Sequence, residues 1–294
     1  MNLDALSLLE TTPPIYPPEA NNAASLAIQQ FAKDNGFEFE LQNSRLVQYS
    51  WRDYKTLPAW LGATSFAATK DAYNIVSGTY MNYPFTMFLM WDNLTDGVQY
   101  SRPNEQQRMN YTQQQTTGIV RITLSKLFPQ IVLDSNKNDR IQSSLRTEYE
   151  KSQRIDLEGD FGQYFDLYVP SGLQINALSL LAPNMMQIIK NHSGLFDVEF
   201  NGHELILWTR KTLYHPENMK LLQDALNEQL VYMDRLLLSW SYAPIQKPID
   251  ILKKPNIGGS TIKIGRLRMT AKTQLIVICM FFIIFALILI TLNE

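Results

Sequence analysis

Three histidines are the first residues whose chemistry could matter. His192, His203 and His215 are separated by eleven and twelve positions. A zinc site built on one helix or one turn needs ligands about three to five residues apart. No two histidines have that spacing, and we predict no histidine metal site.

Four carboxylates follow one another near the middle of the chain: Asp156, Glu158, Asp160 and Asp166. Alternating acids of this kind begin the calcium loop of an EF-hand. A loop that began at Asp156 would need glycine at position 161 and glutamate at 167, where this chain has Phe161 and Leu167. We therefore expect a strand edge whose carboxylates face water, and we predict no metal and no cofactor.

Signatures of nucleophilic and nucleotide chemistry are missing from the sequence. The single cysteine, Cys279, lies inside a long apolar run, so the rest of the chain has neither a thiol nucleophile nor a disulfide framework. Gly258-Gly259-Ser260 is not followed by the lysine and hydroxyl residue of a phosphate-binding loop. We predict no catalytic residues, although an enzyme with scattered active-site residues stays open as an alternative.

An uncharged apolar run occupies the C-terminal end of the chain. From Leu275 to Leu292 the residues read LIVICMFFIIFALILITL. As a helix with a rise of 1.5 Å per residue they would span about 27 Å, and the hydrocarbon core of a bilayer is about 30 Å thick. The sequence therefore predicts one transmembrane helix over residues 273–292, preceded by a basic linker over residues 241–272.

Six cations precede the apolar run and none follows it: Lys253, Lys254, Lys263, Arg266, Arg268 and Lys272. Because basic residues beside a span stay on the cytoplasmic side, we predict a tail-anchored, single-pass protein of the cell membrane with a cytoplasmic body. The same six residues are the candidate contacts with anionic lipid headgroups at the membrane surface.

The charge of the chain is unevenly distributed. The six cations and Glu294 give residues 251–294 a charge of +5, and the first 250 residues carry 20 cations and 27 anions, or −7. A nucleic-acid binder would place its cations on the folded body. The acidic body therefore argues against a nucleic-acid partner.

The body is predicted to cover residues 19–240, after an extended, proline-rich leader over residues 1–18. Residues 19–35 have apolar positions at helical spacing and precede Gly36, a typical helix stop. Apolar and polar residues then alternate over residues 37–42. This alternation is typical of a half-buried strand.

Antiparallel sheet is expected next along the chain. Two runs of β-forming residues flank a short turn at Met81-Asn82. The polar stretch from Asp92 to Thr116 is predicted to be a long loop. Residues 118–124 and 130–134 predict two further strands, separated by Leu127-Phe128-Pro129.

The second half of the body mixes strands and helices. Short strands and a helical region over residues 174–191 are followed by Asn201-Gly202, a dipeptide that favours a type I′ turn, so we predict a β-hairpin over residues 196–208. Apolar residues recur every three or four positions over residues 216–240, which predicts one long amphipathic helix. The expected fold class is α+β, with antiparallel β-hairpins covered by helices and one C-terminal transmembrane helix.

Several stretches over residues 70–210 share an order with a known family: Ser77-Gly-Thr-Tyr80, Gly118-Ile-Val-Arg-Ile-Thr-Leu124, Leu157-Glu-Gly-Asp-Phe161, Leu180-Leu-Ala-Pro183 and Phe196–Trp208. In this order they resemble the bacterial domain-of-unknown-function family 3137, whose members are associated with membranes. The resemblance implies no catalytic residue. Two features depart from the family: Ala182 replaces a threonine that would cap the next helix, and the apolar run follows the domain, whereas in the family the spans often precede it.

Together these features predict a membrane protein whose cytoplasmic α+β body acts as a binding or adaptor module. The expected partners are the lipid bilayer and a protein that the sequence does not name. Two alternatives stay open, a membrane-bound, hydrolase-like enzyme and a lipid-sensing module.

Overall fold

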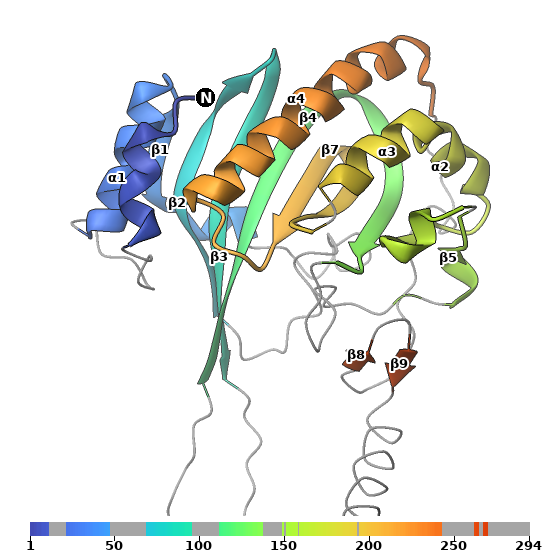
Figure 1. The fold of residues 1–294 in the computed structure, drawn as a ribbon, viewed down its shortest axis with the longest axis horizontal. Helices are drawn as coiled ribbons and strands as arrows, with labels where there is room; N and C mark the ends of the chain where they lie inside the picture. Colours follow the sequence, from blue (N-terminus) through green and yellow to red (C-terminus); the bar gives the residue numbers. More distant parts are fainter. Residues whose placement is uncertain are drawn as a thin grey trace, which may run out of the picture.

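The computed structural model describes residues 1–11, 22–47, 69–95, 112–137, 149, 151–157, 159–192, 194–242, 262–264 and 267–269. These residues form a seven-stranded antiparallel sheet with helices on one side of it (Figure 1). The predicted α+β class is confirmed at this level. The apolar run at residues 273–292 lies outside the described residues, and no helix within them has the length and apolar character needed to cross a membrane.

The helices and strands have the following bounds: α1 Ala23–Asp34, β1 Glu38–Gln42, β2 Thr69–Tyr80, β3 Tyr83–Thr95, β4 Thr112–Ser135, β5 Arg154–Ile155, β6 Phe165–Tyr168, α2 Gln174–Leu180, α3 Pro183–Asn191, β7 Asp197–Thr209, α4 Pro216–Ser239, β8 Ile262–Ile264 and β9 Leu267–Met269. The large sheet has the order β1-β2-β3-β4-β6-β5, and β7 also pairs with β4. Strands β8 and β9 form a separate two-stranded sheet.

Helix α1 and strand β1 agree with the sequence prediction, but the extended leader predicted over residues 1–18 is wrong for its first part. Asp4–Glu10 forms a 3-10 helix because Leu6 and Leu9 are buried in the larger core. Asn22 caps α1, because its side chain accepts a hydrogen bond of 2.7 Å from the backbone N–H of Ala24. Gly36 follows the helix with a φ of 69°, the left-handed conformation that glycine adopts without strain. The chain then reverses directly into β1, which pairs antiparallel with β2.

Strands β2 and β3 are joined by the predicted turn. Met81 and Asn82 both have positive φ, 49° and 68°, as the two central residues of a type I′ turn do. The polar stretch Asp92–Thr116 was predicted to be a loop, and this is wrong at both ends, because Asp92 pairs with Gln115 in the β3–β4 ladder. Backbone pairing accommodates polar side chains, so composition alone misplaced the strand ends.

The predicted hairpin over residues 196–208 does not exist, because β7 is one continuous strand. The interruption predicted at Leu127-Phe128-Pro129 likewise lies within a continuous strand, β4. The two irregular sites face each other, since Phe128 is the register partner of Gly202, and the β4–β7 register shifts on both sides of Phe128. Two local turn signals therefore mark a single irregular point shared by two long strands.

The helical predictions are confirmed with one refinement. Helix α4 covers almost the predicted range, and the residues of its apolar stripe are buried: Leu222, Leu226, Leu230, Met233, Leu237 and Trp240. The helical region over residues 174–191 is two helices, because α3 begins at Pro183. Ala182 precedes α3 and provides no side-chain cap, as predicted from its lack of a hydroxyl group.

The two faces of the sheet are covered differently. Apolar side chains from all four large helices join the larger core on one face, where α4 crosses the sheet in Figure 1. The opposite face carries a smaller apolar cluster that includes Phe88, Ile119, Tyr168 and Trp208. Several buried polar residues of the central strands, among them Gln130, Asp134 and Glu199, lie on that second face.

Candidate functional site

A groove lies between α1 and the edge strand β1. Its lining comes from one side of the helix and one side of the strand: Leu26, Gln29, Gln30, Lys33, Phe37 and Phe39. The groove has a volume of about 670 Å³, which is within the usual range of ligand-binding sites. The two elements that line it, α1 and β1, are labelled at the left side of Figure 1.

The strand side of the groove is held rigidly by aromatic packing. The ring of Phe37 contacts Phe85 edge-to-face with 4.9 Å between centroids, and it also meets Phe31 at 6.3 Å. Gly78 makes room for this ring, because a Cβ at that position would lie 2.7 Å from Phe37 Cδ1. The wall of the groove is therefore preformed.

The helix side of the groove is the exposed stripe of α1. Leu26 is 48% exposed although it is a large apolar side chain. Gln30 and Lys33 follow it on the same side of the helix, and the Gln30 amide donates to Asp34 at 2.6 Å. One wall thus offers apolar surface, amide groups and a cation to whatever enters the groove.

The backbone of β1 has a free edge among the described strands. Strand β1 is the end of the sheet order and pairs with β2 alone. The N–H of Asn43 donates to the carbonyl of Ala72 in β2. Because successive residues of a strand alternate in direction, the N–H and C=O groups of Glu38 and Glu40 point away from β2, toward the free edge.

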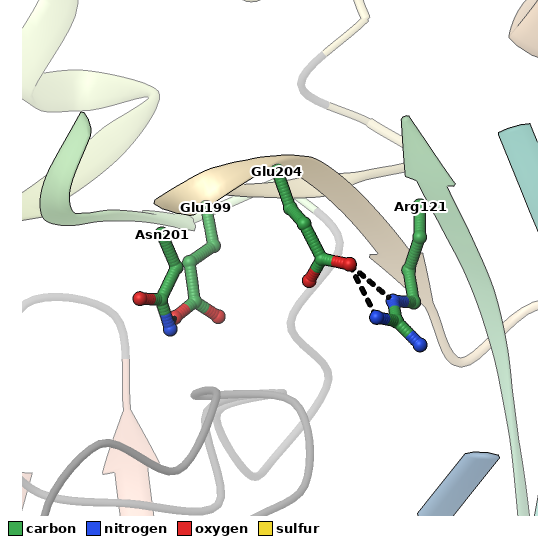
Figure 2. A network of polar contacts seen from close by, with 4 residues as sticks. All are labelled: Arg121, Glu199, Asn201 and Glu204. Atoms are coloured by element: carbon green, nitrogen blue, oxygen red, sulfur yellow. Dashed lines mark hydrogen bonds and ion pairs between the residues drawn. The ribbon is translucent and has the colours of Figure 1, made fainter. Parts of the chain in front are cut away.

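The second face of the sheet contains a network of buried and partly buried polar side chains on β4 and β7. Glu199 accepts hydrogen bonds from Gln130 at 2.8 Å and from Asn201 at 3.3 Å. Arg121 Nε donates to Glu204 at 3.0 Å. Figure 2 shows four of these side chains, with Glu204 directed at Arg121 and Glu199 beside Asn201.

Three aspartates extend this network along neighbouring strands. Asp134 and Asp166 are register partners on β4 and β6, and both are buried. Arg154 contacts Asp166 at 2.8 Å, and the backbone N–H of Ser135 donates to Asp197 at 2.6 Å. A charged donor therefore stabilises Asp166 inside the sheet, and a backbone donor stabilises Asp197.

Tyr149 lies over this network. Its ring packs against Tyr168 with 5.2 Å between centroids, and its hydroxyl has no hydrogen-bond partner among the described residues. Burial raises the pKa of Tyr149 well above its ordinary value, and the negative charges of Glu199 and Asp134 raise it further. The hydroxyl thus stays protonated at neutral pH.

The predicted acidic strand edge is only partly correct. Asp156 is 96% exposed and Asp160 pairs with Lys190 near the surface, but Asp166 is buried on the second face. The prediction failed for Asp166 because its strand, β6, is paired on both sides. Glu158 lies outside the described residues, and those that are described include no cluster of three or more acidic, histidine or cysteine side chains fit to hold a metal ion.

The histidines are dispersed. His203 is exposed and its Nδ1 lies 3.2 Å from the carbonyl oxygen of Leu124, whereas His192 lies 3.6 Å from Glu228. His215 occupies the N-cap position of α4, where its side chain forms no capping hydrogen bond. The structure does not bring the three together.

Of the six basic residues predicted at the membrane surface, two lie in described strands. Lys263 in β8 and Arg268 in β9 are register partners. The remaining four, Lys253, Lys254, Arg266 and Lys272, lie outside the described residues.

Sequence reasoning missed the groove. One signal for it was present, because Glu38 and Glu40 alternate with phenylalanines, and charged residues are common on edge strands. The position of β1 at the end of the sheet depends on which strands pair, and this is not visible in a local pattern.

No family model matches this chain, and the search of curated proteins finds no match either. Among solved structures, the crystal structure of the mycobacterial trehalose monomycolate transport factor A, TtfA, aligns with a TM-score of 0.45 and 11% identity. The alignment covers 75% of this chain and 98% of that one. A likeness at this level supports no conclusion about function.

Proposed function

We propose that this chain is a tail-anchored, single-pass membrane protein whose cytoplasmic α+β body is a binding module for a protein partner. The observation that carries the binding role is the preformed groove between α1 and β1, which combines apolar surface with a strand edge that no other described strand pairs with. Helix-and-edge grooves of this kind bind extended peptides in other domains.

The membrane part of the proposal rests on the sequence. The apolar run at residues 275–292 has the length of a bilayer span, and the six basic residues from Lys253 to Lys272 precede it. A protease-protection assay on intact membranes tests the orientation. We expect the body to be digested without opening the membrane; protection until the membrane is opened would contradict the cytoplasmic assignment.

Site-specific photo-crosslinking of the full chain in its native membrane tests the binding role. A crosslinking amino acid at Gln29 samples the groove, and one at Asp224, exposed on α4, is the matched control. We expect a discrete protein adduct from the groove position only. Equal adducts at both positions, or none at either, would contradict a binding role for this groove.

Lipid sensing is a second candidate, which the β8–β9 register favours. Lys263 and Arg268 are directly opposed in this two-stranded sheet. This register places two basic residues at the same level of one short hairpin, and anionic lipid headgroups attract basic residues near a membrane surface. Flotation with anionic and neutral vesicles, using a chain that ends after Lys272, tests this role; equal flotation with both would exclude it.

A further inference from the structure

We infer that the groove beside β1 takes up an extended peptide in which basic and apolar residues alternate, bound as an added strand of the sheet. The inference rests on the proposed binding role and names the chemistry of the partner. It joins three observations: the outward backbone groups of β1, the apolar groove on one side of them, and the carboxylates on the other.

The backbone supplies the docking groups. Glu38 and Glu40 direct their N–H and C=O groups to the free edge, as deduced from the bond between Asn43 and Ala72. An added strand that matched the five residues of β1 would be about 17 Å long. Main-chain hydrogen bonds of this kind provide affinity without specifying a side chain.

The side chains of β1 specify the pattern. Phe37 and Phe39 face the groove with Leu26, so every second residue of the added strand meets apolar surface. Glu38 and Glu40 are exposed on the opposite side of β1. Glu40 accepts a hydrogen bond from the neutral Asn43 amide at 3.0 Å, and neither glutamate forms an ion pair with a described cation.

Charge complementarity therefore selects the intervening residues. Residues of the added strand on the Glu38 and Glu40 side lie opposite two carboxylates, where opposite charge is stabilising and like charge is destabilising. Lysine or arginine at these positions satisfies both glutamates. The peptide thus carries apolar residues toward α1 and basic residues toward the other side.

The same charges disfavour a second copy of this chain as the occupant. Antiparallel pairing of two β1 strands centred on Glu40 would place Glu40 opposite Glu40. Opposed glutamates at a sheet edge oppose self-association. A partner strand with the complementary charge has no such conflict.

Fluorescence anisotropy with the full chain in lipid nanodiscs tests the inference. The probe is a short labelled peptide of alternating valine and lysine, and its comparisons are an alternating valine and glutamate peptide and an isomer with the lysines grouped together. We expect the alternating basic peptide to bind at least about ten-fold more tightly than either comparison. Equal binding of the isomer would overturn strand addition, since only alternation separates the two peptides.

Two variants locate the peptide. Glu40→Pro removes an outward N–H without removing a bond to β2, because proline is tolerated on the outer edge of a sheet, and we expect peptide binding to be lost. Glu38→Lys with Glu40→Lys leaves the backbone intact and should reverse the preference from the basic to the acidic peptide. Glu217→Lys with Asp224→Lys, exposed on α4, is the control with the same change in charge.

The outcomes separate this inference from the proposed function. If the chain with Glu38→Lys and Glu40→Lys still binds the basic peptide as before, the carboxylates of β1 do not select the peptide and the inference is overturned. An equal loss of binding in the α4 control would overturn it as well. A groove crosslink at Gln29 without any binding of the basic peptide would overturn the inference and leave the binding role standing. Dimerisation that Glu40→Pro abolishes, measured by light scattering, would identify a second copy as the occupant and also overturn it.

Discussion

The face of the sheet that the helices cover is lined by apolar side chains, whereas the opposite face buries carboxylates beside a smaller apolar cluster. Leu230 and its neighbours on α4 are buried by the first face. Asp134, Asp166 and Glu199 are buried on the second, where Gln130 donates to Glu199 and Arg154 pairs with Asp166.

The two faces contribute to the folded state by different interactions. Burial of apolar area is non-directional and contributes most of the free energy of folding. A buried carboxylate with its partner adds little net free energy of folding. Removal of the partner is costly, because a buried charge is then left unpaired. We therefore expect the first face to determine how stable the fold is, and the second to be sensitive to single polar changes.

The largest effect is expected on the helix-covered face. Leu230→Ala should lower the free energy of unfolding by about 2 to 5 kcal/mol, because it removes buried methyl groups and leaves a cavity. Val231→Ala is the adjacent control, since Val231 is 45% exposed, and should change stability by less than about 0.5 kcal/mol. Urea denaturation measures both, and equal losses would contradict the assigned face of α4.

On the second face, Arg154→Ala should cost about 2 to 3 kcal/mol. The substitution leaves the buried Asp166 without its guanidinium, and the estimate is below that for a fully buried pair because Arg154 is 33% exposed. Asp156→Asn, at the solvent-exposed end of the same arginine, should have almost no effect. Similar denaturation midpoints for both variants would show that the Arg154–Asp166 pair does not support this face.

A smaller loss, about 1 to 2 kcal/mol, is expected from Tyr214→Phe. The Tyr214 hydroxyl is buried and lies 2.5 Å from the carbonyl of Asn74 and 3.1 Å from that of Met87. Removing it takes away the single proton that the hydroxyl donates to these buried carbonyls, next to a residue held at a φ of 50°. Tyr80→Phe, which removes an exposed bond to Asn227, is the control in a thermal unfolding series.

The smallest effect concerns pH on the second face. The pKa of Tyr149 is raised above its ordinary value near 10, so unfolding releases a proton above pH 10, and stability present below pH 10 is lost as pH rises. Tyr149→Phe removes an unsatisfied buried hydroxyl, so it should be neutral or slightly stabilising at pH 7. The free energy of unfolding of this variant should also fall less between about pH 10 and 11 than that of the unsubstituted chain. Urea denaturation at several pH values measures this, and an equal fall in both proteins would contradict the assignment.

Local patterns were sufficient for elements whose signal is periodic. The stripe from Leu222 to Trp240 predicted α4 and its buried side, because a helix places every third or fourth residue on one face. The turn at Met81-Asn82 was also predicted correctly. Both depend on residues close together in the chain.

Patterns failed where pairing with a distant strand decided the outcome. Asn201-Gly202 was predicted to reverse the chain, but β7 continues because β4 runs beside it on both sides of this point. Asp166 was expected in water and is buried because β4 and β5 flank its strand. Pairing with a strand that is distant in the sequence therefore overrides the local turn preference of Asn201-Gly202.

The sequence by itself determined the α+β class, the long helix, the separation of an acidic body from a basic C-terminal region, and the prediction of a membrane span. These follow from composition and short-range periodicity. Only the tertiary structure decided that β1 is an edge, that α1 leaves a groove beside it, and that four carboxylates are buried on one face. The reason is physical: an edge, a groove and a buried charge are defined by which distant segments meet, and no local stretch of sequence contains that information.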